Sequence, residues 1–241
     1  MLLEVQALEA RHGLLQAVRD VSLQVAEGET LALVGANGAG KTTLLRTIAG
    51  GHRAAAGRVL FDGTDVTRSS AHKRVRMGIA LVPEGRHLFP RLTVDENLRV
   101  AGGNGRKGPW SLDAVYAAFP NLEPLRRHRA GTLSGGEQQA TAIGRALMTN
   151  PRLLLVDEAS LGLSPVAVDG VYRSLQTVIE SGATIILVEQ DLRRAMKVAT
   201  RISCMLEGRI VLEGTPSELT REAVVDAYFG LREAGTSQAT A

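Results

Sequence analysis

The stretch Gly35-Ala36-Asn37-Gly38-Ala39-Gly40-Lys41-Thr42 matches the pattern G-x-x-x-x-G-K-[ST] at every fixed position. The mostly apolar residues 30–34 before it predict a buried strand, and residues 43–49 after it have apolar side chains at helical spacing. A strand that leads through a glycine-rich turn into a helix directs backbone N–H groups, and the positive end of the helix, at one point. The stretch therefore predicts a phosphate-binding loop for a nucleoside triphosphate.

This loop is expected to supply side chains as well as backbone groups. Lys41 is placed to reach the β- and γ-phosphates, and the Thr42 hydroxyl is placed to bind Mg²⁺. Glycine allows the chain to approach an anion closely, so the backbone is expected to wrap around the phosphates. The expected phosphate-contacting residues are Gly35, Ala36, Asn37, Gly38, Ala39, Gly40, Lys41, Thr42 and Thr43.

A second motif places two carboxylates at the end of a strand. Residues 151–158 read Pro-Arg-Leu-Leu-Leu-Val-Asp-Glu, an apolar strand that ends in Asp157 and Glu158. Asp157 is expected to hold Mg²⁺ through water, and Glu158 to polarise the water that attacks the γ-phosphate. Together with the phosphate loop, this pair indicates a triphosphatase.

The segment Leu133-Ser134-Gly135-Gly136-Glu137-Gln138-Gln139 lies shortly before the carboxylate strand. Ser-x-x-Glu in front of apolar residues at helical spacing is a capping box, which predicts that a helix begins here. A capped helix start is also an anion site, so the segment fits a structural and a phosphate-binding role at once. Similar boxes occur at residues 93–96 and 215–218, so the complete string is the specific feature.

At these motifs the chain resembles the ATP-binding cassette (ABC) ATPases over residues 1–230. In that family the Leu-Ser-Gly-Gly-x-Gln segment is the signature motif, which contacts the γ-phosphate of an ATP held by a second subunit. The resemblance implies that Ser134, Gly135 and Gly136 contact nucleotide across a homodimer or heterodimer of ATPase subunits. It also implies that the cofactors are ATP and Mg²⁺.

Three further segments are similar to the shorter ATPase subunit of high-affinity branched-chain amino acid importers: Leu81–Arg86, Asp157–Leu163 and Leu187–Asp191. The resemblance implies uptake of branched-chain or related amino acids through two membrane permease subunits, fed by a periplasmic solute-binding protein. The expected location is the cytoplasmic face of the inner membrane. Leu88-Phe89-Pro90 is expected to be either an exposed tip that meets the permease or part of the core. A urea or amide importer and a soluble non-transport ABC ATPase are the alternatives.

Four positions differ from the general cassette pattern. Glu84 replaces the usual Gln, and Gln190 replaces the usual switch His, and both replacements are typical of the importer subgroup. We expect both to sense the γ-phosphate, with Gln190 joining Lys41 as a catalytic residue alongside the general base. His12 occupies the place of the aromatic residue that stacks on adenine, with an exposed turn residue as the alternative. Ser164 replaces an Asp that is usual in the family. We therefore do not assign this position a role in communication between the two subunits.

The order of elements predicts an α/β fold: a P-loop NTPase (RecA-like) core with an antiparallel β flank and an inserted helical subdomain. The expected flank consists of strands at residues 3–8, 21–25 and 58–61. Residues 93–147 are expected to be mostly helical and to end in the signature helix. A closing hairpin is expected to turn at Glu207-Gly208, and Pro216 to begin the last helix. Residues 231–241 are expected to form a mobile tail, because Gly235–Ala241 are small and polar.

Composition disfavours several other classes of protein. Only 3% of the 241 residues are aromatic, so stacking platforms for nucleic acid are scarce despite a net charge of +3, and no nucleic-acid partner is expected. No apolar run reaches the roughly 18–20 residues of a membrane-spanning helix, and residues 1–5 do not resemble a signal peptide. The single cysteine, Cys204, excludes an intrachain disulfide framework and is expected to be buried in a strand. A GTPase or kinase is disfavoured because no Asn/Thr-Lys-x-Asp guanine motif occurs.

Overall fold

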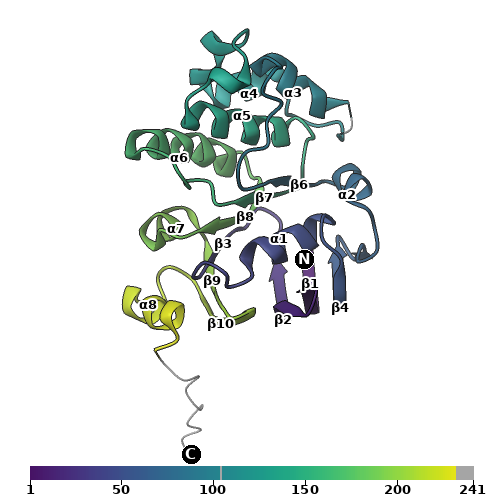
Figure 1. Ribbon diagram of the computed structural model, residues 1–241, viewed down its shortest axis with the longest axis vertical. Helices are drawn as coiled ribbons and strands as arrows, with labels where there is room; N and C mark the ends of the chain where they lie inside the picture. Colours follow the sequence, from purple (N-terminus) through teal and green to yellow (C-terminus); the bar gives the residue numbers. More distant parts are fainter. Residues whose placement is uncertain (104, 232–241) are drawn as a thin grey trace, which may run out of the picture.

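The structure is a computed structural model that describes residues 1–103 and 105–231. Its central sheet contains β3 (Thr30–Val34), β6 (Ile79–Val82), β7 (Leu153–Asp157), β8 (Thr184–Glu189), β9 (Arg201–Leu206) and β10 (Arg209–Gly214). These strands lie in the order β10-β9-β3-β8-β7-β6 (Figure 1). All neighbours in this sheet pair in parallel except β9 and β10, which form an antiparallel hairpin. The predicted parallel core and the closing hairpin are therefore confirmed.

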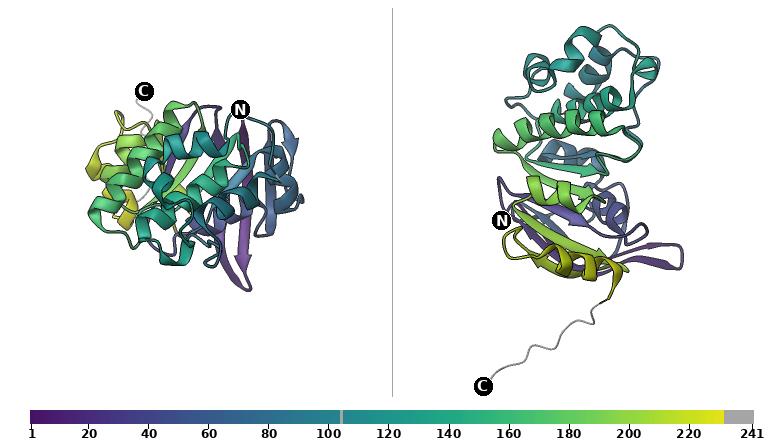
Figure 2. Two further views of the ribbon diagram at one scale, coloured as in Figure 1. Left: turned by 90° about the horizontal axis from the view of Figure 1, so that it is seen from above. Right: turned by 90° about the vertical axis from the view of Figure 1, so that its left-hand side faces the viewer.

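The second sheet is the antiparallel flank. It contains β1 (Leu3–His12), β2 (Leu15–Val25), β4 (Ala54–Phe61) and β5 (Thr64–Asp65), in the order β2-β1-β4-β5. β1 and β2 are longer than the sequence predicted, and their hairpin projects from the body of the molecule (Figure 2). The pairing of β1 with β2 shifts register three times beyond Val5. Such irregularities move side chains from one face of the sheet to the other. The alternation of apolar and polar residues is therefore lost before β1 ends, and the predicted strand was too short.

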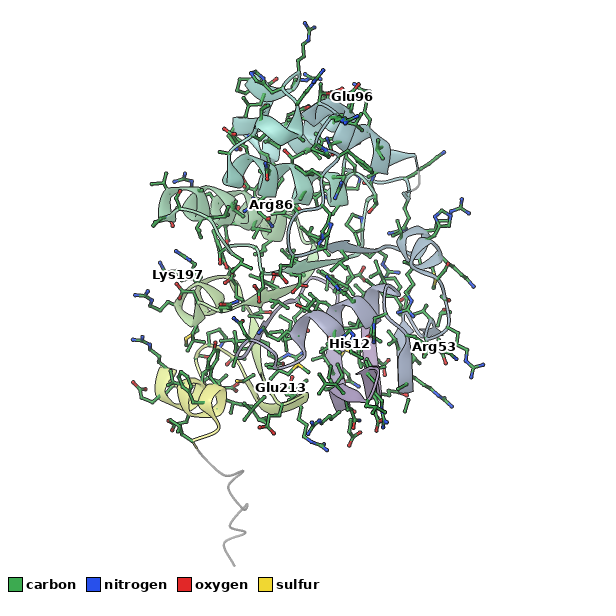
Figure 3. The ribbon with its side chains drawn as sticks, in the orientation of Figure 1. His12, Arg53, Arg86, Glu96, Lys197 and Glu213 are labelled. Carbon is green, nitrogen blue, oxygen red and sulfur yellow. The ribbon has the colours of Figure 1, made fainter. Side chains whose placement is uncertain are left out.

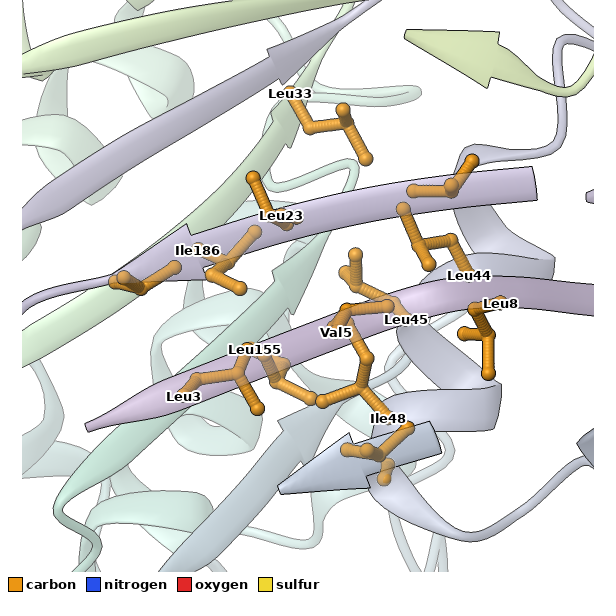
Figure 4. Packing of buried hydrophobic residues seen from close by; sticks show 14 of the residues in the cluster. Leu3, Val5, Leu8, Leu23, Leu33, Leu44, Leu45, Ile48, Leu155 and Ile186 are labelled. Atoms are coloured by element: carbon orange, nitrogen blue, oxygen red, sulfur yellow. The ribbon is translucent and has the colours of Figure 1, made fainter. Parts of the chain in front are cut away.

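Helix α1 (Lys41–Ala49) lies between the two sheets, directly after the phosphate loop. Its apolar face packs on one side against the central sheet and on the other side against the flank (Figure 4). Each fully buried aliphatic side chain contributes about 1.5–3 kcal/mol. The residues that form this contact include Leu44, Leu45 and Ile48 of α1, Leu33, Leu155 and Ile186 of the central sheet, and Leu3, Val5 and Leu8 of β1. The burial fixes the start of α1 where the phosphates are expected.

The far end of α1 is held by a buried arginine of α2 (Ala71–Met77). Arg74 is 2% exposed, and its Nη1 donates to the carbonyl oxygens of Thr47 and Ile48, each at 2.7 Å. Burial lowers the pKa of its guanidinium, which Asp65 partly opposes. These carbonyl groups belong to the last turn of α1, where backbone donors run out; the Gly50 N–H reaches the Thr47 carbonyl oxygen at 3.2 Å. Arg74 therefore satisfies the end of the helix opposite to the phosphate loop.

The other face of the central sheet is covered by helices, and the helical subdomain forms the far end of the molecule (Figure 1). It contains α3 (Val94–Gly102), α4 (Leu112–Ala118), the 3₁₀ segments Pro120–Leu125 and Ala130–Thr132, and α5 (Gly135–Leu147), with α6 (Pro165–Glu180) packed against α5. Both Thr93 and Ser134 form complete capping boxes, at the starts of α3 and α5. Helices α3 to α5 lie within residues 93–147, and the division of the chain into a subdomain at these residues remains a prediction.

The prediction that Pro216 begins the last helix is wrong. That helix, α8, spans Arg221–Phe229 and has Thr220 as its N-cap. Residues 215–219 form a single turn, in which the N–H groups of Glu218 and Leu219 both donate to the Thr215 carbonyl oxygen at 3.1 Å. Thr220 has extended backbone geometry, which ends this turn before a helix can continue. Leu219 packs into the cluster beneath α7 (Leu192–Val198) and α8, so burial of this side chain competes with the local capping signal.

The predicted mobile tail lies outside the described residues except for Leu231. Within the part of the chain that is described, no helix has both the length and the apolar character that crossing a bilayer requires.

Candidate nucleotide-binding and catalytic site

A hollow of about 370 Å³ lies where four strands of the central sheet end. The phosphate loop follows β3, Glu84 follows β6, Glu158 follows β7 and Gln190 follows β8. Ligands of open α/β sheets bind at this edge because the strand ends converge there. The β1–β2 hairpin closes the remaining side. The lining residues are His12, Leu15, Ala17, Asn37, Gly38, Gly40, Lys41, Thr42, Thr43, Glu84, Glu158, Leu161 and Gln190.

Two glycines of the phosphate loop are required by close approaches of other backbone segments. Gly35 has φ of +153°, and a Cβ atom there would lie 2.1 Å from the Met205 carbonyl oxygen. Gly40 has φ of +103°, and a Cβ atom there would lie 2.1 Å from the Ala17 carbonyl oxygen. A side chain at either position would therefore push the loop away from β9 or from β2, and the shape of the hollow depends on both contacts.

Lys41 spans the phosphate loop from inside. Its side chain is 4% exposed, and Nζ donates to the carbonyl oxygens of Gly35 at 2.6 Å and of Ala36 at 2.9 Å. Burial lowers the pKa of this ammonium group, while the nearby carboxylates Glu158 and Asp157 act in the opposite direction. A cation with little solvent around it attracts an anion strongly, so the loop is prepared for phosphate.

Asp157 is a buried carboxylate that is only half satisfied by hydrogen bonds. The Thr42 hydroxyl donates to its Oδ1 at 3.1 Å, whereas its Oδ2 has no partner among the described residues. Burial raises the pKa of Asp157 to about 6, with Glu158 and Glu84 adding to the effect and the Thr42 hydrogen bond opposing it. An unpartnered buried oxygen with two other carboxylates near it is an environment that a further cation would relieve.

These residues fit Mg²⁺, which prefers oxygen ligands and commonly uses one or two protein groups together with substrate phosphates. Thr42 and Asp157 are the groups that would hold it. Among the described residues no three His, Cys, Asp or Glu side chains are clustered as a complete protein-made metal cage. A metal shared between protein and nucleotide is therefore the arrangement that these groups favour.

Glu158 is turned away from Asp157 by an unusual backbone conformation. Its φ is +51°, in the left-handed region, and its N–H donates to the Val188 carbonyl oxygen at 3.2 Å. A non-glycine residue pays roughly 1 kcal/mol for this geometry. The left-handed turn directs the Glu158 side chain into the hollow, while Asp157 contacts Thr42. The two carboxylates thus have different neighbours, and their roles as metal ligand and general base remain predictions.

His12 lies at the end of β1 beside α1, at the rim of the hollow (Figure 3). Its Nε2 is 3.0 Å from the Thr43 hydroxyl, and its ring centroid is 4.6 Å from that of His52. The side chain is exposed, and it is held in place by α1 and by a second imidazole. This position agrees with an adenine contact, which remains a prediction.

The signature residues do not lie at this hollow. Ser134 accepts the Glu137 N–H at 3.4 Å, and the Glu137 carboxylate accepts the Ser134 N–H at 2.7 Å. Gly135 and Gly136 pack closely against α6 and the segment before it. All four residues line a separate hollow of about 770 Å³. The structure therefore does not bring the signature segment to the phosphate loop of the same chain.

Several site features were not anticipated from the sequence. Leu15, Ala17 and Leu161 line the hollow, although no role was assigned to them. Leu15 and Ala17 follow His12 across the β1–β2 hairpin turn. A hairpin predicted at this turn would have placed both residues beside His12 at the hollow. Ser164, where the family has Asp, serves as the N-cap of α6 by accepting the Ala167 N–H at 3.4 Å.

The sequence left two alternatives for Leu88 and Phe89: an exposed tip, or part of the core. In the structure Leu88 follows the second and Phe89 the first. Leu88 packs partly into the cluster of the helical subdomain. Phe89 is 48% exposed, and the guanidinium of Arg145 lies 5.7 Å from its ring centroid. Its backbone is fixed by Asn97, whose Oδ1 accepts the Phe89 N–H at 2.9 Å. A rigidly held, exposed aromatic ring therefore follows Glu84.

The geometry described above defines a P-loop nucleoside triphosphatase. Its helical insertion lies between the loop that carries Glu84 and the strand that ends in Asp157. The chain belongs to the ABC transporter family, whose model matches residues 18–161. It is accordingly an ABC-type ATPase, which binds and hydrolyses ATP, as the sequence motifs predicted.

Known relatives agree over nearly the whole chain. It is 43% identical to the high-affinity branched-chain amino acid transport ATP-binding protein BraG of Pseudomonas aeruginosa, over 95% of this chain and 100% of that protein. It is 32% identical to the lipopolysaccharide export system ATP-binding protein LptB of Escherichia coli K12, over 89% and 91% of the two chains. A crystal structure of a nucleotide-free ATP-binding cassette from an ABC transporter matches with a TM-score of 0.80 at 28% identity, covering 94% and 98%.

Proposed function

We propose that this chain drives an importer for branched-chain or related amino acids. The support is the higher identity to BraG, 43%, than to the lipopolysaccharide export protein LptB, 32%, both over most of the chain. A branched-chain amino acid transport ATP-binding protein of Archaeoglobus fulgidus, named LivF, is 35% identical over 90% of this chain. The proposed setting is the cytoplasmic face of the membrane, beneath two permease subunits supplied by a solute-binding protein.

We assign a different role in ATP binding or hydrolysis to each group of residues at the hollow. The phosphates of ATP would lie on Lys41 and the loop backbone, with adenine against His12. Mg²⁺ on Thr42 and Asp157 would supply positive charge to the phosphate oxygens. Glu158 accepts a proton from the attacking water, because its carboxylate reaches into the hollow from a fixed backbone turn. Gln190 and Glu84 lie on the hollow as well, where they would contact the γ-phosphate and its water.

We also propose that the signature segment acts on the nucleotide of a second ATPase subunit. The observation that supports this is the separation of Ser134, Gly135 and Gly136 from the hollow of their own chain. The start of α5 is a helix N-terminus, which is suited to phosphate only if an anion is brought to it from outside. The exposed, rigidly held Phe89 is a candidate contact for the permease.

Two variants test the site. Glu158→Gln should leave ATP binding intact and slow hydrolysis by on the order of 10²–10⁴, because the amide cannot accept the proton. Ser134→Arg should spare ATP binding by the isolated chain and block turnover of the assembled transporter. The matched control is Thr93→Arg, which removes the N-cap of another complete capping box and should cost only about 0.5–2 kcal/mol of stability. Normal hydrolysis by Glu158→Gln, or normal complex turnover by Ser134→Arg, would contradict the corresponding role.

Uptake in cells tests the substrate class. Cells that lack this chain should lose high-affinity uptake of labelled leucine, isoleucine and valine, and the wild-type chain should restore it. Glu158→Gln should not restore uptake, because the transporter would bind ATP without turning over. Unchanged uptake of these amino acids in the deletion strain would refute the proposed importer while leaving the ATPase assignment intact.

A further inference from the structure

Glu189, the last residue of β8, is a buried carboxylate with no part in the roles described above. It is 1% exposed. In residues 1–103 and 105–231 it takes part in no ion pair. Burying a carboxylate without a cation is costly, so an apolar residue would serve stability better at this position. Its use is therefore to be sought in the groups that it contacts.

The carboxylate joins the two segments that carry proposed catalytic residues. Its Oε2 accepts the Ser160 hydroxyl at 3.0 Å and the backbone N–H of Gln190 at 3.1 Å. Ser160 lies in residues 158–164, the segment that connects β7 to α6 and begins with Glu158. One oxygen atom therefore ties this segment and Gln190 to the end of the same strand.

A third neighbour, Tyr172, connects this carboxylate to α6. Glu189 Oε1 and the Tyr172 hydroxyl are both buried, and the carboxylate acts on the hydroxyl although their contact falls short of a well-formed hydrogen bond. Burial, together with the negative charge of Glu189, raises the pKa of Tyr172, so the hydroxyl remains a proton donor. Because α6 begins at the end of segment 158–164, a small shift of that segment would also change the distance between this donor and acceptor.

We propose that Glu189 is a positioning residue for ATP hydrolysis: it holds segment 158–164 and Gln190 in one arrangement, so that Glu158 faces the attacking water. This inference rests on the proposed roles of Glu158 and Gln190. Glu189 does not line the hollow, so it acts through its neighbours and does not contact nucleotide. Alignment matters for the reaction step more than for binding, so the loss should appear in kcat and spare KM.

The test is steady-state Mg-ATP hydrolysis by the assembled transporter that contains this chain. Glu189→Ala should lower kcat about 10- to 100-fold, as loss of a supporting contact behind catalytic groups commonly does, and change KM less than twofold. Glu189→Gln keeps one side-chain oxygen that can accept both hydrogen bonds, and should remain within about threefold of wild type. Ser160→Ala removes the donor of one of these two hydrogen bonds and leaves Glu189 in place. It should lower kcat about 3- to 10-fold, which corresponds to the free energy of one hydrogen bond.

Glu213→Ala is the matched control. This carboxylate, on β10, also accepts a serine hydroxyl, that of Ser203, and it pairs with Arg201. Because neither partner belongs to segment 158–164 or to Gln190, loss of Glu213 should leave kcat unchanged. Ser160→Ala keeps the proposal testable if Glu189→Ala does not fold. The proposal is overturned if both alanine variants keep kcat within twofold, if KM rises as much as kcat falls, or if Glu189→Gln is as slow as Glu189→Ala. Glu158→Gln distinguishes failure of the Glu189 proposal from failure of the proposed function. Normal hydrolysis by that variant would refute Glu158 as the base.

Discussion

Replacing Asp157 by asparagine separates the cost of burying this carboxylate from its use as a metal ligand. The amide is nearly isosteric, and its Oδ1 can still accept the Thr42 hydroxyl. It carries no charge at any pH. We expect Asp157→Asn to stabilise the protein in the absence of metal and nucleotide, and to impair hydrolysis when both are present.

The magnitude follows from the pKa of the buried group. In the folded protein it is raised from 3.8 to about 6, so the fold retains a proton that the unfolded chain has already released. Stability therefore falls as the pH rises through the window between these values, and the loss is complete above about pH 6. A shift of about two units corresponds to roughly 3 kcal/mol. We therefore expect the two proteins to differ by about 2–3 kcal/mol.

Urea unfolding with a metal chelator, at several pH values between about 4 and 8, measures this difference. Asp157→Asn should be more stable than wild type at the upper end, and the gap should narrow toward pH 4, where the folded aspartate is protonated and the unfolded one approaches half protonation. Addition of Mg-ATP should favour wild type, because a ligand that binds the folded state stabilises it by mass action. A gap that is independent of pH, or a wild type that is more stable without metal at pH 8, would refute the reasoning.

Two further predictions concern the ends of α1. His12→Ala should weaken ATP binding by about 1 kcal/mol, at the low end for a stacked base, whereas His12→Tyr should bind equally or more tightly; equal affinity of all three proteins in a calorimetric titration would exclude stacking. Arg74→Met should cost about 3 kcal/mol in urea unfolding, because the buried Ile48 carbonyl loses its donor and the Thr47 carbonyl keeps only the Gly50 N–H. The exposed Arg76 on the same helix provides the control, and Arg76→Met should change stability by less than about 0.5 kcal/mol.

Local signals in the sequence were sufficient for most of the core. Strand β3 has the bounds predicted for the buried strand before the phosphate loop, and Thr93 and Ser134 cap helices as their boxes indicated. Cys204 is buried in β9, where burial raises the pKa of its thiol to about 11. In these elements periodicity, capping and burial all favour the same structure.

The errors arose where tertiary contacts outweigh a local signal. Pro216 and Glu218 resemble a helix start, but burial of Leu219 and the extended Thr220 delay the helix to Arg221. The lining of the hollow by Leu15 and Leu161 depends on how a hairpin and a loop approach the phosphate loop in space. No spacing along the chain encodes such contacts, and the same is true of the link from Glu189 to Ser160.

The strand that carries the phosphate loop has consequences for how the chain is made. On one side Thr30 of β3 pairs with Ile185, and on the other Leu31 pairs with Arg201. During synthesis the flank and α1 emerge early, but both neighbours of β3 leave the ribosome only with residues 184–206. Pairing between such distant segments is slow, and an apolar strand without neighbours invites association with other chains. Gly35 meets Met205 only after this step, so a growing chain acquires its ATP site near the end of translation.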